Sequence, residues 1–180
     1  SYRRLADYLA LAQRQNWVLT VIGDGQARTE VEAVFARLGP EKVRFLGARA
    51  RIEMPKLYAG ADIYVWPAAG EAYGMALLEA QASGLPVVAG KVRGVTDVIL
   101  DGQTGFLTPE GDAEAFAGVI DFLIGDADAR RAMGETGKRF VGNMRSMEKA
   151  AIILNAGLTA LLRDQRGATP GWWSRLWRRG

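Results

Sequence analysis

The sequence contains no cysteine and no histidine among its 180 residues. Without cysteine there is no disulfide framework and no thiol chemistry. Without histidine there is no imidazole general base, no Ser–His or Cys–His nucleophile and no histidine metal ligand. Any acid–base or electrostatic work must therefore come from Asp, Glu, Lys, Arg, Tyr or the backbone.

The sequence also lacks a large excess of one charge and a long apolar run. Its net charge is +3 with both signs mixed along most of the chain, which does not favour nucleic acid as a partner. It contains no signal-peptide pattern and no apolar span of about 18 residues, so we expect a cytoplasmic protein. The 49% hydrophobic content is enough for one domain with its own core.

Short apolar runs alternate along the chain with segments of helical periodicity. Strands are predicted at 17–22, 43–46, 63–66, from Val87 onward and at 106–107. Helices are predicted at 2–15, 29–38, 54–60, 75–82, 95–100, after Asp112, at 126–141 and at 147–162. This alternation predicts an α/β fold, a Rossmann-like parallel sheet with helices on both faces. Because the chain opens in a helix, we expect a strand of the same sheet to precede it.

Residues 70–89 form the most informative stretch, G-E-A-Y-G-M-A-L-L-E-A-Q-A-S-G-L-P-V-V-A. The pattern predicts a loop, a helix, a tight exit and a buried strand. Met75 begins a run of good helix formers, Gly84 suits a left-handed exit, and Pro86 prevents continuation of the helix.

Two carboxylates bracket the start of this helix. Glu71 lies in the preceding loop, and Glu79 lies a little over one turn inside the helix. Between them, the first N–H groups of the helix can hold an anion, while the carboxylates can accept hydrogen bonds from sugar hydroxyls. Taken alone, the same residues also fit an exposed loop carboxylate and an exposed helix carboxylate.

The segment E-A-Y-G-M-A-L-L-E resembles the E-x7-E motif of retaining group 1 glycosyltransferases, family 4 of the GT-B fold. The resemblance continues with E-A-Q-A-S-G-L-P-V-V-A and G-V-T-D-V-I-L-D-G-Q-T-G-F-L, and upstream with V-I-G-D-G, V-R-F-L-G and L-Y-A-G-A-D-I-Y-V-W-P. These blocks follow the family order over residues 17–141. They imply the carboxyl-terminal, donor-binding half of an enzyme that transfers a hexose from a UDP- or GDP-sugar to an acceptor hydroxyl. Retention of configuration and a role in polysaccharide, glycolipid or cell-envelope glycan synthesis are implied as well.

The resemblance implies a role for each matching residue. Glu71 is implied as the catalytic residue that holds the donor hexose without attacking it, and Glu79 is implied to bind the ribose of the nucleotide. The backbone at the helix start is implied to contact the hexose and the diphosphate, through Tyr73, Gly74, Met75 and Ala76.

Two other loops resemble donor-binding segments of the family. Gly23 and Gly25 match its glycine loop, although the same residues also suit an ordinary strand-to-helix turn. The segment that reads the nucleobase through its backbone corresponds to Gly47, Ala48 and Arg49. All these loops follow predicted strands, and parallel strands end at one edge of their sheet, where ligands bind.

Several family features differ or are absent. Asp97 stands where the family often has a glutamate near the donor phosphates, and it could instead cap the helix it begins. The Arg/Lys pair that neutralises the leaving diphosphate is absent, and Arg3 and Arg4 are not candidates for it. The amino-terminal, acceptor-binding half is absent too, so we expect that half as a partner and expect this chain alone to be inactive. With no histidine, no metal cluster and no D-x-D pair in a predicted loop, we expect no metal and no other cofactor.

The last residues differ from the rest of the chain. We predict a donor-binding domain over 1–165 and a basic, tryptophan-rich tail over 166–180. One interpretation packs the tryptophans back onto the domain or onto the absent half. The other is peripheral contact with an anionic membrane, at the inner membrane face. The residues concerned are Trp172, Trp173, Trp177, Arg175, Arg178 and Arg179.

Two alternatives to the enzyme remain at this point. The fold could serve as a non-catalytic nucleotide-sugar-binding module, which the absent Arg/Lys pair favours. It could also serve as a membrane-peripheral interaction domain that acts through its tail.

Overall fold

The structure, a computed structural model, describes residues 1–144, 151–152 and 155–156. The chain divides into two compact units, Ser1–Val141 and Gly142–Gly180. In the second unit, residues 151–152 and 155–156 are helical. Most of the predicted 147–162 helix and the whole 166–180 tail lie outside the described residues, so the tail remains a prediction. Among the helices that are described, none combines the length and apolarity that a membrane span needs.

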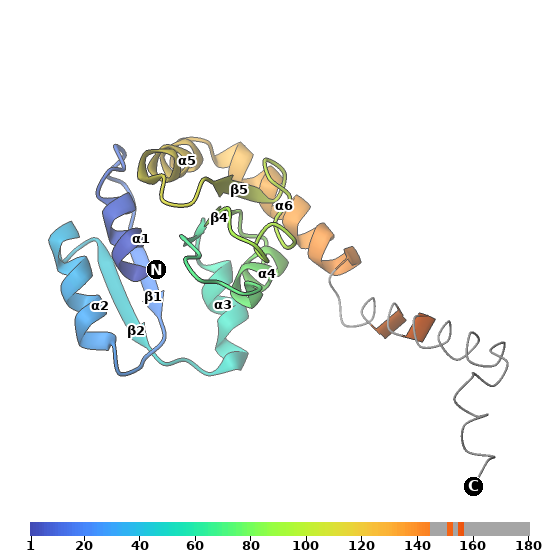
Figure 1. The fold of residues 1–180 in the computed structure, drawn as a ribbon, viewed down its shortest axis with the longest axis horizontal. Coiled ribbons are helices and arrows are strands. Elements are labelled where there is room, and N and C mark those ends of the chain that lie inside the picture. Colours follow the sequence, from blue (N-terminus) through green and yellow to red (C-terminus); the bar gives the residue numbers. More distant parts are fainter. Residues whose placement is uncertain (145–150, 153–154, 157–180) are drawn as a thin grey trace, which may run out of the picture. The chain divides into compact units, whose positions relative to one another are not determined.

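The first unit alternates strands with helices, as the sequence predicts (Figure 1). The strands are β1 (Leu19–Ile22), β2 (Val43–Gly47), β3 (Tyr64–Trp66), β4 (Val87–Gly90) and β5 (Gly105–Thr108). The α-helices are α1 (Tyr2–Leu9), α2 (Arg28–Phe35), α3 (Met54–Ala59), α4 (Met75–Ala82), α5 (Ala113–Gly125) and α6 (Ala127–Met144). Short 3-10 helices, η1 (Ala36–Leu38) and η2 (Arg51–Glu53), follow α2 and precede α3.

All strand pairs are parallel, but they form two sheets, β1–β2 and β3–β4–β5, where the sequence predicts one. Leu19 lies opposite Val43 in the first sheet, and Tyr64 lies opposite Val87 in the second. None of the described strands pairs with members of both sheets. Strands β1 and β3 are largely half-buried, whereas β4 is buried throughout. The strand expected before the first helix remains a prediction.

Strand β4 shows how helices cover both faces. Val87 and Ala89 belong to a core cluster with residues of α3 and α4, whereas Val88 belongs to a second cluster with residues of α1, α2 and α5. Successive strand side chains point to opposite faces, so this division places helices on each side. Burial of each of the two valine side chains contributes about 1.5–3 kcal/mol. The predicted α/β class is therefore confirmed.

Helix α4 has the bounds that the sequence predicts. Gly74 precedes it with a left-handed φ of 79°, and Gly84 follows it with a φ of 85°. The Leu85 N–H then donates to the Ala80 carbonyl at 3.0 Å, which uses a carbonyl at the helix end. Pro86 leads directly into β4, and thus the loop, the helix and the buried strand follow one another within a short stretch.

The predicted helix at 95–100 is wrong, because this segment forms consecutive turns. The N–H of Val95 donates to Val92 at 3.1 Å, and that of Val98 donates to Val95 at 3.1 Å, which are turn bonds three residues long. The segment is rich in β-branched residues, which have low helix propensity. Three of its apolar side chains are nevertheless buried in the cluster with α3 and α4, namely those of Val95, Val98 and Ile99.

The first helix is shorter than the predicted 2–15 and ends at Leu9. The Asp121 carboxylate of α5 accepts the backbone N–H groups of Gln13 and Arg14, both at 2.8 Å. Those N–H groups would otherwise donate to helix carbonyls, so a contact from far along the chain fixes where the helical region stops. The periodicity of residues 2–15 cannot predict a contact with such a distant residue.

Candidate functional site

The loop between β3 and α4 positions Glu71. Ala68, fully buried, adopts a left-handed φ of 59°, and its carbonyl accepts the Glu71 N–H at 2.9 Å. The Glu71 side chain then turns towards the helix, where its Oε1 accepts the Gly74 N–H at 3.1 Å. A negative charge at a helix start is favourable, because the helix dipole is positive there.

Two backbone donors at the start of α4 remain open. The Leu77 and Leu78 N–H groups both donate to the Gly74 carbonyl, at 3.0 and 3.3 Å. Within the described part of the chain, the N–H groups of Met75 and Ala76 have no hydrogen-bond acceptor, and both residues are exposed. Such open N–H groups are suited to bind phosphate or another anion.

Glu79 lies on α4, one helical turn beyond these donors, and is half-buried. The Tyr58 hydroxyl of α3 donates to Glu79 Oε2 at 3.3 Å. Burial, together with the charge of Glu79 and this hydrogen bond, raises the pKa of Tyr58 to about 12. Burial also raises the pKa of Tyr64, whose ring centroid lies 6.1 Å from that of Tyr58. Both phenols therefore keep their protons at neutral pH and can act as donors.

The end of β4 and the segment that follows it pack against the backbone of the loop over residues 67–74, which we call the Glu71 loop. A Cβ on Gly94 would lie 2.1 Å from the carbonyl oxygen of Ala72, and a Cβ on Gly90 would lie 2.2 Å from that of Pro67. Both glycines thus allow the two backbones to touch. Gln81, fully buried on α4, donates to the carbonyl of Val98 at 2.8 Å and so ties this segment to the same helix.

The two glycine-containing loops after β1 and β2 meet each other. The N–H of Gly23 donates to the Gly47 carbonyl at 2.9 Å, and Gly47 has a left-handed φ of 70°. Gly25, Ala48 and Arg49 are exposed beside them. No hydrogen bond joins these loops to the Glu71 loop among the residues that the structure describes. The structure therefore places the predicted residues in two groups, one at the Glu71 loop and α4 and a second in the loops after β1 and β2. Asp97 lies in an exposed turn.

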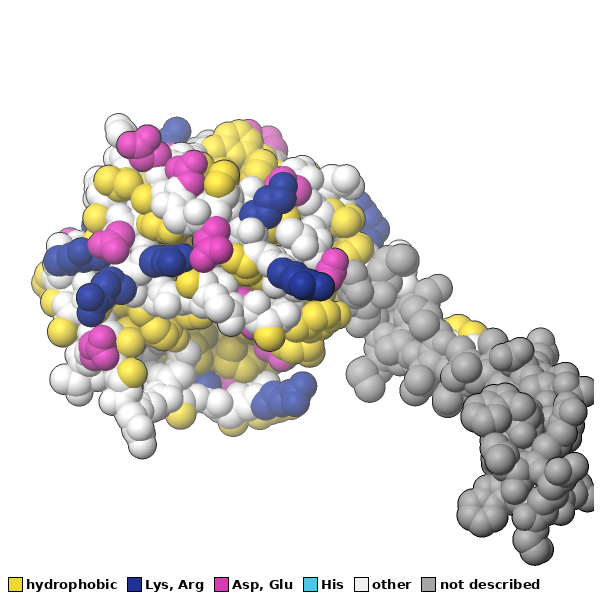
Figure 2. All heavy atoms as spheres, viewed as in Figure 1, with side chains coloured by type: hydrophobic (Ala, Val, Ile, Leu, Met, Phe, Trp, Pro, Cys, Tyr) yellow, Lys and Arg dark blue, Asp and Glu magenta, His cyan; other side chains and the backbone are white. Residues whose placement is uncertain are grey.

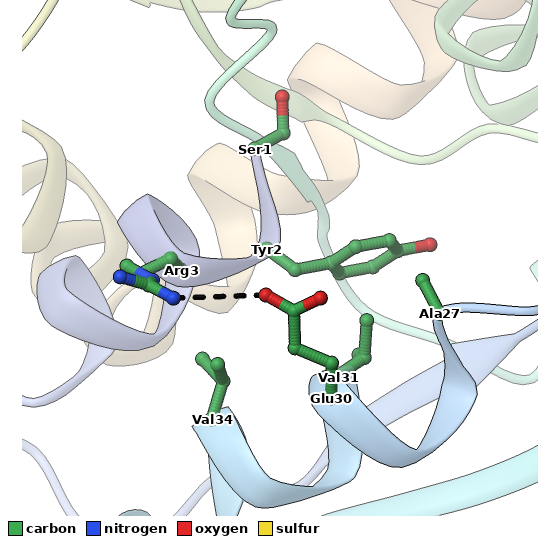
Figure 3. Close-up of a pocket in the computed structure, with 7 residues that line it drawn as sticks. All are labelled: Ser1, Tyr2, Arg3, Ala27, Glu30, Val31 and Val34. Carbon is green, nitrogen blue, oxygen red and sulfur yellow. Dashed lines mark ion pairs between the residues drawn. The ribbon is translucent and has the colours of Figure 1, made fainter.

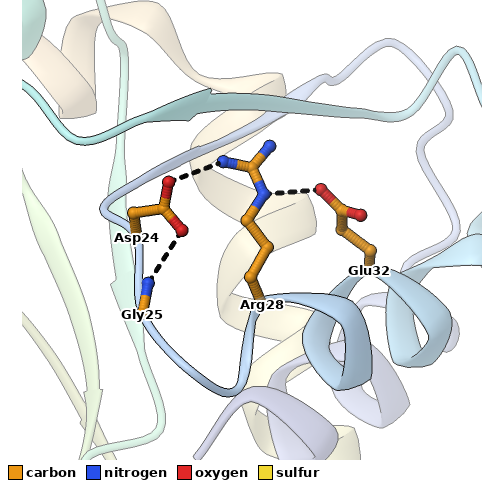
Figure 4. A network of polar contacts seen from close by, with 4 residues as sticks. All are labelled: Asp24, Gly25, Arg28 and Glu32. Carbon is orange, nitrogen blue, oxygen red and sulfur yellow. Dashed lines mark hydrogen bonds and ion pairs between the residues drawn. The ribbon is translucent and has the colours of Figure 1, made fainter.

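Arg28 fastens the first glycine loop (Figure 4). Its Nε donates to Glu32 at 2.7 Å and its guanidinium pairs with Asp24 at 3.4 Å, while Asp24 accepts the N–H of Gly25 at 2.8 Å. The guanidinium also lies over the Phe45 ring at 5.8 Å. The i, i+4 spacings from Asp24 to Arg28 and from Arg28 to Glu32 are signals that could have predicted this network.

A shallow pocket lies elsewhere, between α1 and α2 (Figure 3). None of the predicted site residues lines it, since its lining consists of Ser1, Tyr2, Arg3, Ala27, Glu30, Val31 and Val34. Its charged side chains pair with each other, Arg3 with Glu30 at 3.6 Å, and both are largely exposed. Acidic and basic side chains are also interspersed on the face that Figure 2 shows. The start of α4 is therefore the stronger candidate.

Comparisons with known proteins show to which family the chain is similar. Residues 3–140 match the family described as "Glycosyl transferases group 1". A D-inositol 3-phosphate glycosyltransferase from Corynebacterium urealyticum is 37% identical over 115 residues, which are 63% of this chain and 27% of the relative. The aligned part thus spans about a quarter of that curated relative.

Solved structures extend the likeness to three dimensions. HepE from Anabaena, in complex with UDP and glucose, superposes with a TM-score of 0.77 at 26% identity, over 87% of this chain and 44% of HepE. The C-terminal domain of a glycosyl transferase group 1 family protein (LpcC) from Francisella tularensis gives a TM-score of 0.70 at 25% identity. That match covers 81% of this chain and 79% of the LpcC domain.

Proposed function

The chain belongs to the group 1 glycosyltransferases, and from this membership we propose that it is the donor-binding half of a retaining enzyme. The reaction is transfer of a hexose from a nucleotide sugar, a UDP- or GDP-sugar, to an acceptor hydroxyl. Its products are polysaccharide, glycolipid or cell-envelope glycans. The match to the Francisella C-terminal domain supports the assignment to that half of the enzyme.

The observation that carries the proposal is the start of α4. The open N–H groups of Met75 and Ala76 lie between two carboxylates, those of Glu71 and Glu79. A nucleotide sugar carries a diphosphate between a hexose and a ribose, so it presents an anion flanked by hydroxyls. Backbone donors and the helix dipole hold the diphosphate, and the carboxylates accept from the hydroxyls on either side.

The proposal assigns a role to each predicted site residue. Glu71 positions the hexose, Glu79 accepts from the ribose diol, and the backbone from Tyr73 to Ala76 contacts the diphosphate. The second group, formed by the loops after β1 and β2, reads the nucleobase through Gly23, Gly25, Gly47, Ala48 and Arg49. Support for this second assignment is the hydrogen bond that joins Gly23 to Gly47 and the network that fixes Arg28 beside them.

The developing charge on the leaving diphosphate needs stabilisation. We assign this task to the N–H groups of α4 and to cations of the complete enzyme, without a metal. The proposed proton acceptor for the acceptor hydroxyl is the leaving phosphate itself. Glu71 orients the donor through hydrogen bonds and forms no covalent bond to it. The acceptor binds to an amino-terminal half, and the greater length of the curated relatives supports that expectation.

The test is a thermal-unfolding titration of the chain with UDP, GDP, ADP and their sugar conjugates, beside Glu79→Ala. A ligand that binds the folded state alone stabilises it by about 2.7 kcal/mol at a hundred times its Kd. Loss of the Glu79 contact should cost about 1–3 kcal/mol of binding free energy. Glu135→Ala, an exposed carboxylate on α6, is the matched control and should behave as wild type.

Either of two results contradicts the proposal. Absence of any stabilisation at millimolar nucleotide means that the chain is not a donor-binding half in its own right. An unchanged response in Glu79→Ala means that a nucleotide binds, but at another place.

A further inference from the structure

Tyr58 is a buried polar residue that the E-x7-E segment does not contain. It lies near the end of α3 and is only 7% exposed, with its ring in the same core cluster as Leu77 and Leu78 of α4. From there its hydroxyl donates to Glu79 Oε2 at 3.3 Å. A contact between residues 21 positions apart joins two helices at the proposed ribose carboxylate.

The contact uses one oxygen of Glu79 and leaves the other available. Among the described residues, Tyr58 is the only hydrogen-bond donor to this carboxylate. Glu79 is half-buried, so its free oxygen lies within reach of a ligand. A carboxylate has about four lone-pair sites and can accept from a phenol and from a vicinal diol together.

We propose that Tyr58 is a positioning residue for the donor nucleotide: it holds one oxygen of Glu79 so that the carboxylate faces the ribose diol. The inference rests on the proposed function, because it requires a ribose beside Glu79. A glutamate side chain loses rotamer freedom when it binds a ligand, and a fixed partner removes part of that cost before the ligand arrives.

The surroundings keep the phenol in the form that this role needs. Burial and the charge of Glu79 raise the pKa of Tyr58 to about 12, so the hydroxyl remains a neutral donor throughout the physiological range. Tyr64, whose pKa is raised as well, adds no negative charge beside Glu79 at neutral pH. The ring is held by the core and by Tyr64, which fixes where the hydroxyl points.

The test compares Tyr58→Phe with wild type by calorimetric titration of the chain, with UDP and 2′-deoxy-UDP as probes. If GDP proves to be the stronger ligand, GDP and its 2′-deoxy form replace them. We expect Tyr58→Phe to weaken binding of the ribonucleotide by about fivefold to tenfold. Binding of the deoxynucleotide should change much less, because one hydroxyl of the diol is already absent.

A purely structural effect would look different. It would weaken both nucleotides by the same factor, and that result would overturn the inference. Tyr64→Phe is the matched control: it removes a neighbouring phenol that makes no hydrogen bond among the described residues, so discrimination should stay as in wild type. Circular dichroism checks that each variant is folded.

A second measurement asks whether Tyr58 acts through Glu79. In a Glu79→Ala background, adding Tyr58→Phe should cause no further loss of affinity. Additive losses would mean that Tyr58 contributes independently and would sink the inference. Failure of wild type to bind any nucleotide contradicts the proposed function itself, whereas wild-type binding with an unaffected Tyr58→Phe contradicts only the role of Tyr58.

Discussion

The carboxylate of Glu71 accepts the backbone N–H of Gly74 at 3.1 Å. The first glutamate of the E-x7-E segment thus forms a hydrogen bond within the loop that precedes α4. The contact satisfies one N–H at the start of α4 and places negative charge at the positive end of its dipole. The next two N–H groups stay open to a ligand. Glu71 thus has a structural role in the free protein besides its proposed role in hexose binding.

Substitution can separate these two roles. Glu71→Ala removes the acceptor of the Gly74 N–H and should lower the free energy of unfolding by about 0.5–1.5 kcal/mol. Glu71→Gln keeps a carbonyl acceptor for the Gly74 N–H and should therefore lower the free energy of unfolding by less. Both variants should lose the extra affinity that a sugar nucleotide has over the bare nucleotide. Urea unfolding and calorimetric titration with UDP and UDP-glucose measure the two effects.

The matched control for Glu71→Ala is Asp112→Ala. Asp112 caps α5 by accepting the Ala115 N–H at 2.9 Å, and no contact joins it to the Glu71 loop among the described residues. It should show a similar loss of stability with unchanged nucleotide affinity. If both Glu71→Gln and Glu71→Ala keep the wild-type affinity for the sugar nucleotide, the Glu71 carboxylate stabilises the loop and does not bind the hexose.

Gly94→Ala should disturb the Glu71 loop, because Gly94 packs against the backbone of that loop. The new Cβ would lie 2.1 Å from the Ala72 carbonyl oxygen, and φ at Gly94 is +91°, so the Glu71 loop must move. We expect a loss of about 2–4 kcal/mol in unfolding free energy and weaker nucleotide binding. Gly102→Ala separates strain from contact, because φ there is +72° but nothing lies within 4 Å of the added Cβ. It should cost about 1–2 kcal/mol and leave binding unchanged. Equal effects on binding in both variants would exclude the packing explanation.

The stability of the fold should fall at alkaline pH. The pKa of Tyr58 rises from its ordinary value of about 10 to about 12 in the folded state. Between these values the folded state binds the proton more tightly, so this stabilisation is complete below pH about 10 and is lost as the pH rises towards 12. Tyr64 acts in the same direction. Urea midpoints measured from pH 8 to 11 should decline less in Tyr58→Phe. They should also decline less in Glu79→Gln, since Glu79 supplies part of the shift. Identical declines in all three proteins would contradict the Tyr58–Glu79 contact.

Arg28→Met should weaken nucleotide binding through the glycine loop. The substitution keeps the apolar part of the side chain but releases Asp24 and Glu32, so the loop that meets Gly47 is less constrained. Affinity for UDP should fall severalfold, whereas affinity for pyrophosphate, which lacks a base, should stay the same. Arg131→Met breaks an exposed pair with Asp128 and serves as the control. A parallel loss of pyrophosphate affinity would place Arg28 nearer the phosphates than we propose.

The local elements followed from the sequence where local chemistry decides them. Helix α4 has its predicted bounds, because good helix formers are enclosed between Gly74 and the Gly84–Pro86 exit. Helix α5 begins directly after Asp112, as predicted, and the Asp112 side chain caps it. The segment at 95–100 was predicted wrongly, since helical spacing of Val95, Val98 and Ile99 is also compatible with turns whose side chains enter a core. The truncated first helix depends on Asp121, more than a hundred residues away.

The sequence by itself determined the α/β class, the family and the two carboxylates at the start of α4, because periodicity and spacing along the chain encode these features. Only the tertiary structure decided that Tyr58 donates to Glu79, that Gly94 touches Ala72 and that the parallel strands divide into two sheets. Each of these depends on packing between segments distant in the chain. A hydroxyl and a carboxylate 21 residues apart carry no local signal of their pairing until α3 and α4 share a core.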